Sequence, residues 1–328
     1  MNKEIQELNI KAEKYAEKLK HLNSEINKVI VGQNEIVKKL IIALISNGHV
    51  LIEGVPGLAK TLMVKTLSEC LDSSFIRLQF TPDLLPADIT GTKIYDHKNS
   101  IFKTVQGPIF SNFILADEIN RAPPKVQSAL LEAMQEKQVS IQGETIQLPQ
   151  PFMVLATQNP IESEGTYKLP EAQVDRFMFK LLINYPEKND EIEIIERFTE
   201  GTTINISKIF NSKQIIELQE FNQKIYADKK IKEYVAEIVD ATRHPEKYKL
   251  DINGYIEYGA SPRASLWLIL AAKAHAMIKG RGYVKPEDVK AISHDVLRHR
   301  VLLTYEAEAE NKTSDEIIDQ ILDKIKVP

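Results

Sequence analysis

The stretch that decides the fold is His49 to Thr61, HVLIEGVPGLAKT. A short apolar segment, Val50 to Ile52, runs into a loop with two glycines, and Lys60 and Thr61 follow at the expected start of a helix. The backbone N–H groups of such a loop, with a helix N-terminus behind them, form a site for polyphosphate. We therefore predict a phosphate-binding loop in which Lys60 reaches the β- and γ-phosphates and the Thr61 hydroxyl helps to hold Mg²⁺.

One residue departs from the usual pattern G-x-x-x-x-G-K-[ST], because Ala59 stands where a glycine is expected before the lysine. Alanine fits there without strain if its φ is negative, so we expect a negative φ at Ala59. The residues expected to surround the nucleotide are Gly54, Val55, Pro56, Gly57, Leu58, Ala59, Lys60, Thr61 and Leu62.

Length and composition narrow the class of protein. A chain of 328 residues with 43% hydrophobic residues can build two domains. Its net charge of −4 gives no basic surface for bulk binding of nucleic acid, so none is expected as a partner. The single cysteine, Cys70, suits a reducing compartment. The charged N-terminal stretch does not resemble a signal peptide, and no apolar run is long enough for a membrane span, so we expect a cytoplasmic protein.

The first half of the chain alternates between expected strands and helices, which predicts an α/β fold with a five-stranded parallel sheet and helices on both faces. An amphipathic helix with a solvated outer face is expected over residues 1–28. The expected strands are 50–52, 75–80, 113–116, 152–156 and 177–183. Two β-hairpins, near 93–105 and 139–148, interrupt the alternation.

After Pro186 helical patterns dominate, so the sequence predicts a nucleotide-binding domain over 29–186 and a smaller all-helical lid over 187–328. Helices are expected near 189–199, 212–226, 230–242, 262–279, 286–302 and 315–326. Within this half, Trp267 is interpreted as lid core, and Arg298-His299-Arg300 as a solvated face.

Polar residues follow two of the apolar strands. Asp117 and Glu118 come after Phe113 to Ala116, and Asn159 follows the next strand. Ligands of parallel sheets bind outside the carboxyl ends of the strands. There Asp117 could hold Mg²⁺, Glu118 could polarise the attacking water, and Asn159 could orient that water. The structural alternatives are a capping role for Asp117 and Glu118 and a turn role for Asn159.

Three arginines are further candidates. Arg176 lies just before the fifth strand, at an edge of the α/β unit, where it could reach the phosphate of a neighbouring subunit. Arg263 opens a helix of the lid and could sense the nucleotide state. The alternative for both is a local ion pair. Arg121 is either an interface arginine or a local hydrogen-bonding group.

Taken together, these motifs resemble the MoxR family of AAA+ ATPases over nearly the whole chain. GVPGLAKT resembles the family's Walker A motif, including alanine before the lysine, and FILADEINRAPPK resembles its Walker B region. ATQNP resembles sensor 1, LPEAQVDRF the segment with the arginine finger, and GASPRAS the start of the sensor 2 helix. VGQ, with Val31 and Gln33, resembles the segment beside adenine. The two hairpins match the helix-2 and pre-sensor-1 inserts of the family.

The resemblance implies an ATPase that binds ATP and Mg²⁺ and forms a homo-oligomeric ring, usually a hexamer, in which Arg176 acts on the neighbouring subunit's ATP. It also implies chaperone-like remodelling of client proteins, often ones with a von Willebrand factor A domain. It leaves open whether Arg263 acts in its own subunit or in the next. Two other functions compete with this one: a nucleotide-gated binding module with negligible turnover, and an AAA+ motor on nucleic acid.

Overall fold

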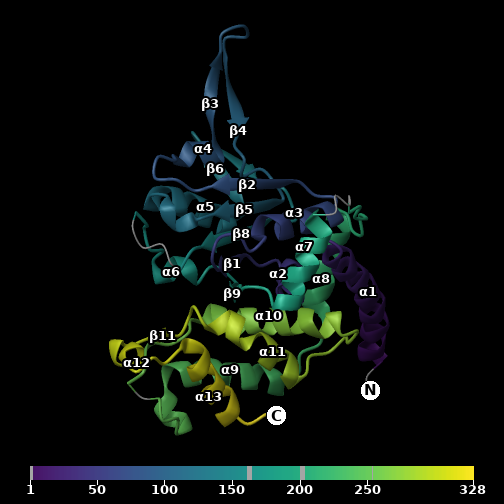
Figure 1. The fold of residues 1–328 in the computed structure, drawn as a ribbon, viewed down its shortest axis with the longest axis vertical. Coiled ribbons are helices and arrows are strands. Elements are labelled where there is room, and N and C mark those ends of the chain that lie inside the picture. Colours follow the sequence, from purple (N-terminus) through teal and green to yellow (C-terminus); the bar gives the residue numbers. More distant parts are fainter. Residues whose placement is uncertain (1–2, 161–164, 200–203, 253) are drawn as a thin grey trace.

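The centre of the molecule is a five-stranded parallel sheet (Figure 1). The computed structural model describes residues 3–160, 165–199, 204–252 and 254–328. The strands are β1 (Val50–Glu53), β2 (Phe75–Gln79), β5 (Phe113–Asp117), β8 (Met153–Gln158) and β9 (Phe179–Leu182). They lie in the order β2-β5-β8-β1-β9, and every neighbouring pair is parallel. The five carboxyl ends therefore share one edge of the sheet, which confirms the fold class predicted from the sequence.

Helices cover both faces of this sheet. Successive side chains of a strand point to opposite faces. Accordingly, Val50 and Ile52 of β1 pack into one hydrophobic core and Leu51 into another. The first core contains residues of α1 (Lys3–Asn27), α2 (Asn34–Ile45) and α3 (Lys60–Cys70), and the second contains those of α5 (Pro124–Glu136). Cys70 is a buried free thiol in the first core, where burial raises its pKa to about 11.

Two antiparallel hairpins leave the sheet. One pairs β3 (Gly91–Asp96) with β4 (Ile101–Gln106), and the other pairs β6 (Gln138–Ile141) with β7 (Glu144–Gln147). Figure 1 shows the β3–β4 hairpin extending far from the body of the molecule. A short helix that the sequence did not predict, α4 (Pro86–Thr90), leads into it. Near its base, Oγ1 of Thr104 donates to a carboxylate oxygen of Glu144 over 2.7 Å, so the two hairpins support each other.

The C-terminal half is mostly helical, but it is not all-helical as expected. Its helices are α7 (Lys188–Thr199), α8 (Ser212–Lys224), α9 (Lys229–Arg243), α10 (Pro262–Ile278), α11 (Pro286–Leu297), α12 (Tyr305–Ala309) and α13 (Ser314–Lys324). It also holds a short antiparallel pair, β10 (Ile256–Tyr258) and β11 (Leu302–Leu303). The helix expected to run to residue 302 ends at Leu297. The expected helix was too long because a short apolar run such as VLL does not distinguish a strand from a helix end.

The N-terminal helix α1 belongs to the body of the molecule. One face buries Ala12, Leu19, Leu22 and Ile26, and the helix packs against α2, α3 and α10. It therefore connects the α/β half to the lid, whereas the sequence alone predicted only its amphipathic character. Within the described ranges, no helix has both the length and the apolar composition needed to cross a membrane.

Candidate nucleotide site

The loop between β1 and α3 curves around the side chain of Lys60. Gly57 has a φ of +86°, in the left-handed region that favours glycine. The Lys60 ammonium donates to the carbonyl oxygen of Gly54 over 2.6 Å. Burial lowers the pKa of Lys60, while the nearby carboxylates of Asp117 and Glu118 act in the opposite direction. Lys60 is thus close enough to the two acidic residues to feel their charge.

The expectation of a negative φ at Ala59 is wrong. Ala59 has φ +52° and ψ +23°, a left-handed conformation, and it is the N-cap residue of α3, which begins at Lys60. Its carbonyl oxygen accepts the first helical hydrogen bond, from the N–H of Met63 over 2.9 Å. The loop therefore needs a left-handed turn at this position and imposes it on alanine, at a cost of roughly 1–2 kcal/mol. Strain of this kind is common at binding sites.

Apolar side chains hold the loop in place. Val55 and Leu62 are partly buried against the first core, and Leu58 is buried within it. Pro56 is exposed at the tip of the loop. Thr61, half-buried in the first turn of α3, follows directly on Lys60. The tip of the loop is thus exposed to solvent, while its base, next to Lys60 and Thr61, is packed against the core.

Asp117 ends β5 and is held on both sides. Its Oδ1 accepts a hydrogen bond from Oγ1 of Thr157 over 2.6 Å. Its Oδ2 accepts two hydrogen bonds from the guanidinium of Arg77, from Nε over 2.9 Å and from Nη2 over 2.7 Å. The carboxylate therefore sits at the carboxyl edge of the sheet, in an orientation fixed by residues of the two neighbouring strands, β8 and β2.

Asp117 and Thr61 together fit Mg²⁺. A carboxylate and a hydroxyl are the hard oxygen donors that Mg²⁺ prefers, and this ion usually completes its shell with water and substrate phosphate oxygens. Such a shell needs no cluster of three acidic or histidine side chains, and the described residues contain no cluster of that kind. When Mg²⁺ is bound it neutralises charge on the β- and γ-phosphates.

Glu118 is held in the same way. It has φ +56°, and its backbone N–H donates to Oγ1 of Thr157 over 2.8 Å. Its Oε2 accepts from Nε2 of Gln79 over 2.7 Å and lies 3.2 Å from Nε of Arg121. Arg121 is thus a local partner of Glu118 in this structure, the second of the two roles considered for it. Both partners contact Oε2, so Oε1 remains the oxygen through which the carboxylate could polarise a water molecule.

Asn159 completes this edge of the sheet. It directly follows β8 and is 8% exposed. The carbonyl oxygen of the preceding residue, Gln158, accepts a hydrogen bond from the N–H of Gly54 over 3.3 Å. The backbone at Asn159 therefore lies beside the phosphate loop. Val31 is buried, and Nε2 of Gln33 donates to the carbonyl of Asn184 over 3.1 Å. This contact attaches the expected adenine segment to the residues after β9.

Arg176 and Arg263 lie at the opposite edge of the sheet. Two residues after Arg176, the N–H of Met178 donates to the carbonyl of His49, which precedes β1, over 2.8 Å. Arg263 reaches the same region, since its Nη2 donates to Oε1 of Gln135 near the end of α5 over 3.4 Å. The four residues of β1 separate the two edges by about 13 Å, at about 3.3 Å each. The short helix α6 covers Glu171–Val174 and ends two residues before Arg176.

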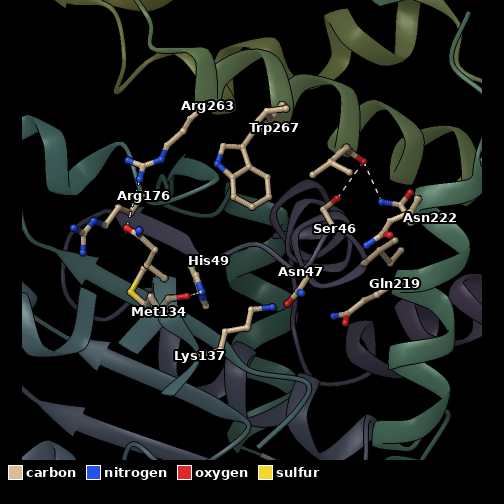
Figure 2. Close-up of a pocket in the computed structure, with 15 residues that line it drawn as sticks. Ser46, Asn47, His49, Met134, Lys137, Arg176, Gln219, Asn222, Arg263 and Trp267 are labelled. Atoms are coloured by element: carbon tan, nitrogen blue, oxygen red, sulfur yellow. Dashed lines mark hydrogen bonds between the residues drawn. The ribbon is translucent and has the colours of Figure 1, made fainter. Parts of the chain in front are cut away.

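A cavity of about 410 Å³ opens beside these two arginines (Figure 2). It lies between α8 and α10 on one side and the residues around His49 and the end of α5 on the other. Trp267 lines it and is only partly buried, so Trp267 is not wholly lid core as interpreted. The Oδ1 atom of Asn222, also in the lining, is buried without a hydrogen-bond partner. The two halves of the molecule are thus incompletely packed next to Arg176 and Arg263.

The interpretation of Arg298-His299-Arg300 as a solvated face is wrong. Arg300 and His299 are 4% and 6% exposed, and the side chain of Arg298 is 11% exposed. Burial lowers the pKa of His299 well below its usual value, and that of Arg300 to about 10. Charged residues are rarely buried without partners. Arg298 pairs with Asp315 of the lid, whereas most acceptors of Arg300 lie at residues 175–178 of the α/β half, which the local sequence does not show.

The residues that hold the acidic pair were not predicted from the sequence, namely Arg77, Gln79 and Thr157. A signal for Arg77 and Gln79 was present, because two polar residues alternate with apolar ones in FIRLQF. This alternation places them on one side of β2. Thr157 stands in the ATQNP motif two residues before Asn159, but its role depends on the pairing of β5 with β8.

Comparisons with known proteins identify the family. The family model described as "ATPase family associated with various cellular activities (AAA)" matches residues 49–179, and the model described as "AAA lid domain" matches residues 249–321. Chaperone MoxR1 of Mycobacterium tuberculosis is 49% identical over 306 residues, which cover 93% of this chain and 81% of that protein. This chain belongs to the MoxR family of AAA+ ATPases.

Two further relatives extend the similarity over the full MoxR fold. The protein YeaC of Bacillus subtilis is 45% identical over 305 residues, which cover 92% of each chain. A solved structure from Cytophaga hutchinsonii, described as a candidate ATPase, is 48% identical, covers 100% of both chains and superposes with a TM-score of 0.92. The AAA+ core and its lid are therefore both present in this chain.

Proposed function

We propose that this MoxR-family protein hydrolyses ATP with Mg²⁺ and uses the cycle to remodel partner proteins. One observation carries the proposal. Lys60, Asp117 and Glu118 lie together at the carboxyl edge of the sheet, whereas Arg176 and Arg263 lie at its amino edge. The two edges are about 13 Å apart along β1, so neither arginine reaches the phosphates bound in its own chain. A complete hydrolytic site therefore needs a second copy of this chain.

In the half of the site that one chain supplies, each residue has a separate task. Lys60 and the loop N–H groups bind the phosphates, and Thr61 and Asp117 hold Mg²⁺. Glu118 takes the proton of the attacking water, and Asn159 orients that water. Val31 and Gln33 lie beside the adenine.

The neighbouring chain supplies the two arginines. An arginine that reaches the γ-phosphate from outside stabilises the charge of the transition state and accelerates hydrolysis by about 10³–10⁵. We assign this role to Arg176. Arg263 contacts Asp175, the residue next to Arg176, over 3.3 Å, so we propose that both arginines act in trans on the same neighbouring nucleotide. A closed ring, with six subunits as is usual in the family, gives every site its second half.

The hairpins are proposed to contact the client. On β3 and β4 the exposed side chains Ile94, Tyr95, Ile101, Phe102 and Val105 are 42–68% exposed. Exposed apolar side chains on a projecting element mark an interaction surface. MoxR1 carries the name chaperone, which supports a protein client here. A client with a von Willebrand factor A domain follows from the family resemblance.

The domain limits remain part of the proposal. Residues 29–186 would form the nucleotide-binding domain and residues 187–328 the lid, with 1–28 as a helix that joins them. The first hydrophobic core runs from α2 and β1 into α8, α10 and α11 without interruption. Movement of the lid therefore requires a change in this shared core. The cytoplasmic location stays a prediction from the sequence.

The direct test measures phosphate release by the purified protein with ATP and Mg²⁺. Glu118→Gln should retain nucleotide binding and lose hydrolysis by about 10²–10⁴. Lys60→Ala should lose nucleotide binding, while Lys65→Ala, on the exposed side of the same helix, should bind normally. Hydrolysis that survives Glu118→Gln would contradict the role of Glu118. Binding without turnover in the wild-type ring would favour the nucleotide-gated module.

A further inference from the structure

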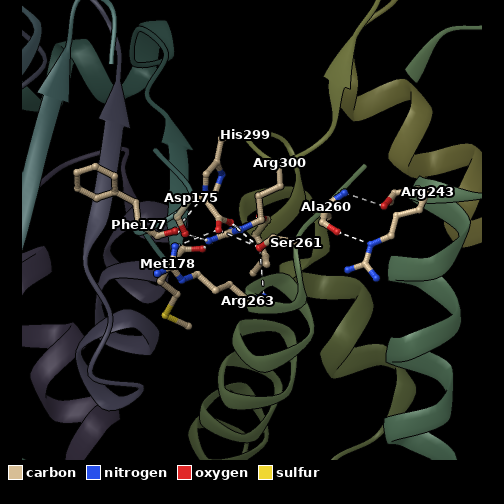
Figure 3. A network of polar contacts seen from close by, with 11 residues as sticks. Asp175, Phe177, Met178, Arg243, Ala260, Ser261, Arg263, His299 and Arg300 are labelled. Atoms are coloured by element: carbon tan, nitrogen blue, oxygen red, sulfur yellow. Dashed lines mark hydrogen bonds and ion pairs between the residues drawn. The ribbon is translucent and has the colours of Figure 1, made fainter. Parts of the chain in front are cut away.

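A buried arginine of the lid clamps the backbone on either side of Arg176 (Figure 3). Arg300 is 4% exposed and has five N–H donors, all of which find an acceptor. Its Nη2 donates to the carbonyls of Asp175 over 2.8 Å and Phe177 over 2.5 Å, and its Nη1 to that of Met178 over 3.2 Å. The remaining donors bond the carbonyl of Val296 and the carboxylate of Asp175. The position of residues 175–178 is thus fixed by the lid.

Asp175 is the point at which three lid residues meet. Its carboxylate accepts from Nε of Arg300 over 2.7 Å, from Nη1 of Arg263 over 3.3 Å, and from Oγ of Ser261 over 2.9 and 3.0 Å to its two oxygens. Ser261 caps the N-terminus of α10, and Arg300 follows α11. The residue next to Asp175 is Arg176, the proposed arginine finger.

This arrangement limits how the lid can move. Burial lowers the pKa of Arg300 to about 10, so the guanidinium remains charged at neutral pH. A buried charge that loses its partner is strongly unfavourable, and hydrogen bonds weaken steeply with distance and angle. If α10 and α11 rotate, residues 175–178 must move with them. Arg176 therefore belongs mechanically to the lid, although it lies between two elements of the α/β half.

We propose that Asp175 and Arg300 are positioning residues that transmit the position of one subunit's lid to Arg176, and hence to the ATP of the next subunit. The inference rests on the proposed function, because it requires Arg176 to act in trans. It assigns a role to the buried Arg298-His299-Arg300 segment, in which His299 also contacts the carbonyl of Phe177 through Nε2 over 3.1 Å.

The test uses full-length rings of two subunit types. Asp175→Asn/Arg300→Gln removes both charges together, so no single buried charge is left without its partner. Because a displacement of about 1 Å can cost 10²-fold in rate, we expect kcat to fall about a hundredfold with unchanged ATP affinity. Arg281→Gln/Asp288→Asn is the matched control, because it also removes both charges of a buried pair. It breaks a similar pair inside the lid, with Asp288 at 2.6 Å, and should leave kcat within about twofold.

Mixed rings identify the subunit that is affected. Glu118→Gln subunits lack hydrolysis but keep an intact Arg176, so mixing them with Arg176→Ala subunits should restore activity. Mixing them with Asp175→Asn/Arg300→Gln subunits should restore activity to a similar extent, because the damage lies only in the trans arginine. If the first mixture recovers and the second does not, the positioning role is wrong. If the first mixture does not recover, the proposed interface site is wrong, and the inference fails with it.

A milder variant tests the same role if the double variant does not fold. Ser261→Ala removes one donor to Asp175 and keeps the buried Arg300 pair. It should lower kcat by a smaller factor, at unchanged ATP affinity, and should also recover with Glu118→Gln subunits. A folded Asp175→Asn/Arg300→Gln ring with wild-type kcat would overturn the proposal outright.

Discussion

Thr157 and Asp117 share a hydrogen bond of 2.6 Å, in which the threonine Oγ1 donates to the carboxylate. The same hydroxyl accepts the backbone N–H of Glu118 over 2.8 Å. One buried side chain of β8 therefore sets both the orientation of the proposed metal ligand and the start of the turn that carries the proposed base. Thr157 therefore acts through Asp117 and Glu118 rather than through a contact of its own with the phosphates.

Thr157→Val should lower activity by about 10–100-fold, the usual effect of removing a group that orients a metal ligand. The loss should be partly recovered at high Mg²⁺, and a Mg²⁺ titration of phosphate release measures it. Thr242→Val is a matched control. Thr242 is buried in the lid and likewise donates one hydrogen bond and accepts one backbone N–H. Equal Mg²⁺ dependence in the two variants would contradict the assignment.

Arg77→Met should make Mg²⁺ bind more readily. The Arg77 guanidinium must give up its pair with Asp117 when the metal arrives, and its side chain is 49% exposed. Exposed pairs contribute at most about 1 kcal/mol, so the Mg²⁺ concentration for half-maximal activity should fall by no more than about fivefold. Lys208→Met, which breaks the exposed pair with Asp72, should leave it unchanged. A higher Mg²⁺ requirement in Arg77→Met would show that Arg77 supports the metal site.

Ala59→Gly should stabilise the protein. Glycine adopts the observed φ of +52° without the cost of roughly 1–2 kcal/mol that alanine bears, although it loses more entropy on folding, by roughly 0.5–1 kcal/mol. The net change in the free energy of unfolding should be a gain of up to about 1.5 kcal/mol, measured by urea titration. Ala16→Gly, in the interior of α1, should instead lose about 1 kcal/mol. A loss at both positions would contradict the strain at Ala59.

His49 should make the protein less stable in mild acid. Its Nδ1 accepts the N–H of Val154 over 3.0 Å, and its Nε2 lies 3.1 Å from the carbonyl oxygen of Met134. Protonation of Nδ1 would break the first bond, and burial lowers the pKa of His49 from 6.5 to about 4. Between these values the unfolded chain binds the extra proton and the folded chain does not, so stability falls as the pH drops from 6.5 toward 4.

At pH 5 this effect amounts to about 2 kcal/mol relative to pH 7. Urea unfolding of His49→Gln should therefore show a smaller loss between pH 7 and pH 5 than the wild type, by about that amount. His21→Gln, at an exposed position on α1, should follow the wild type. Equal losses in His49→Gln and the wild type would show that His49 does not resist protonation in the folded state.

The parts of the fold that are local in the chain could be predicted from the sequence. The strands follow from continuous apolar runs, and the hairpins from alternation around Asn99 and Gly143. The positions of Lys60, Asp117 and Glu118 follow from the rule that ligands bind at the carboxyl edge of a parallel sheet. Pairings between distant segments could not be predicted, because no local pattern encodes them.

The exceptions illustrate this limit. Arg300 looks like one of three exposed basic residues until its acceptors at residues 175–178 are in place. Ala59 was expected to have a negative φ because the residue type favours one, and the closure of the loop overrides that preference. The short strand at Leu302–Leu303 forms only because Ile256 and Tyr258 lie opposite it.

The central claim is that each hydrolytic site is divided between two subunits, and mixed rings of Glu118→Gln and Arg176→Ala test it most directly. Each variant alone should be nearly inactive. In a random mixture of equal parts, about a quarter of the interfaces combine an intact Glu118 with an intact Arg176 from the neighbour. We predict that phosphate release rises toward a quarter of the wild-type rate. Activity that stays at the level of the separate variants would contradict the claim.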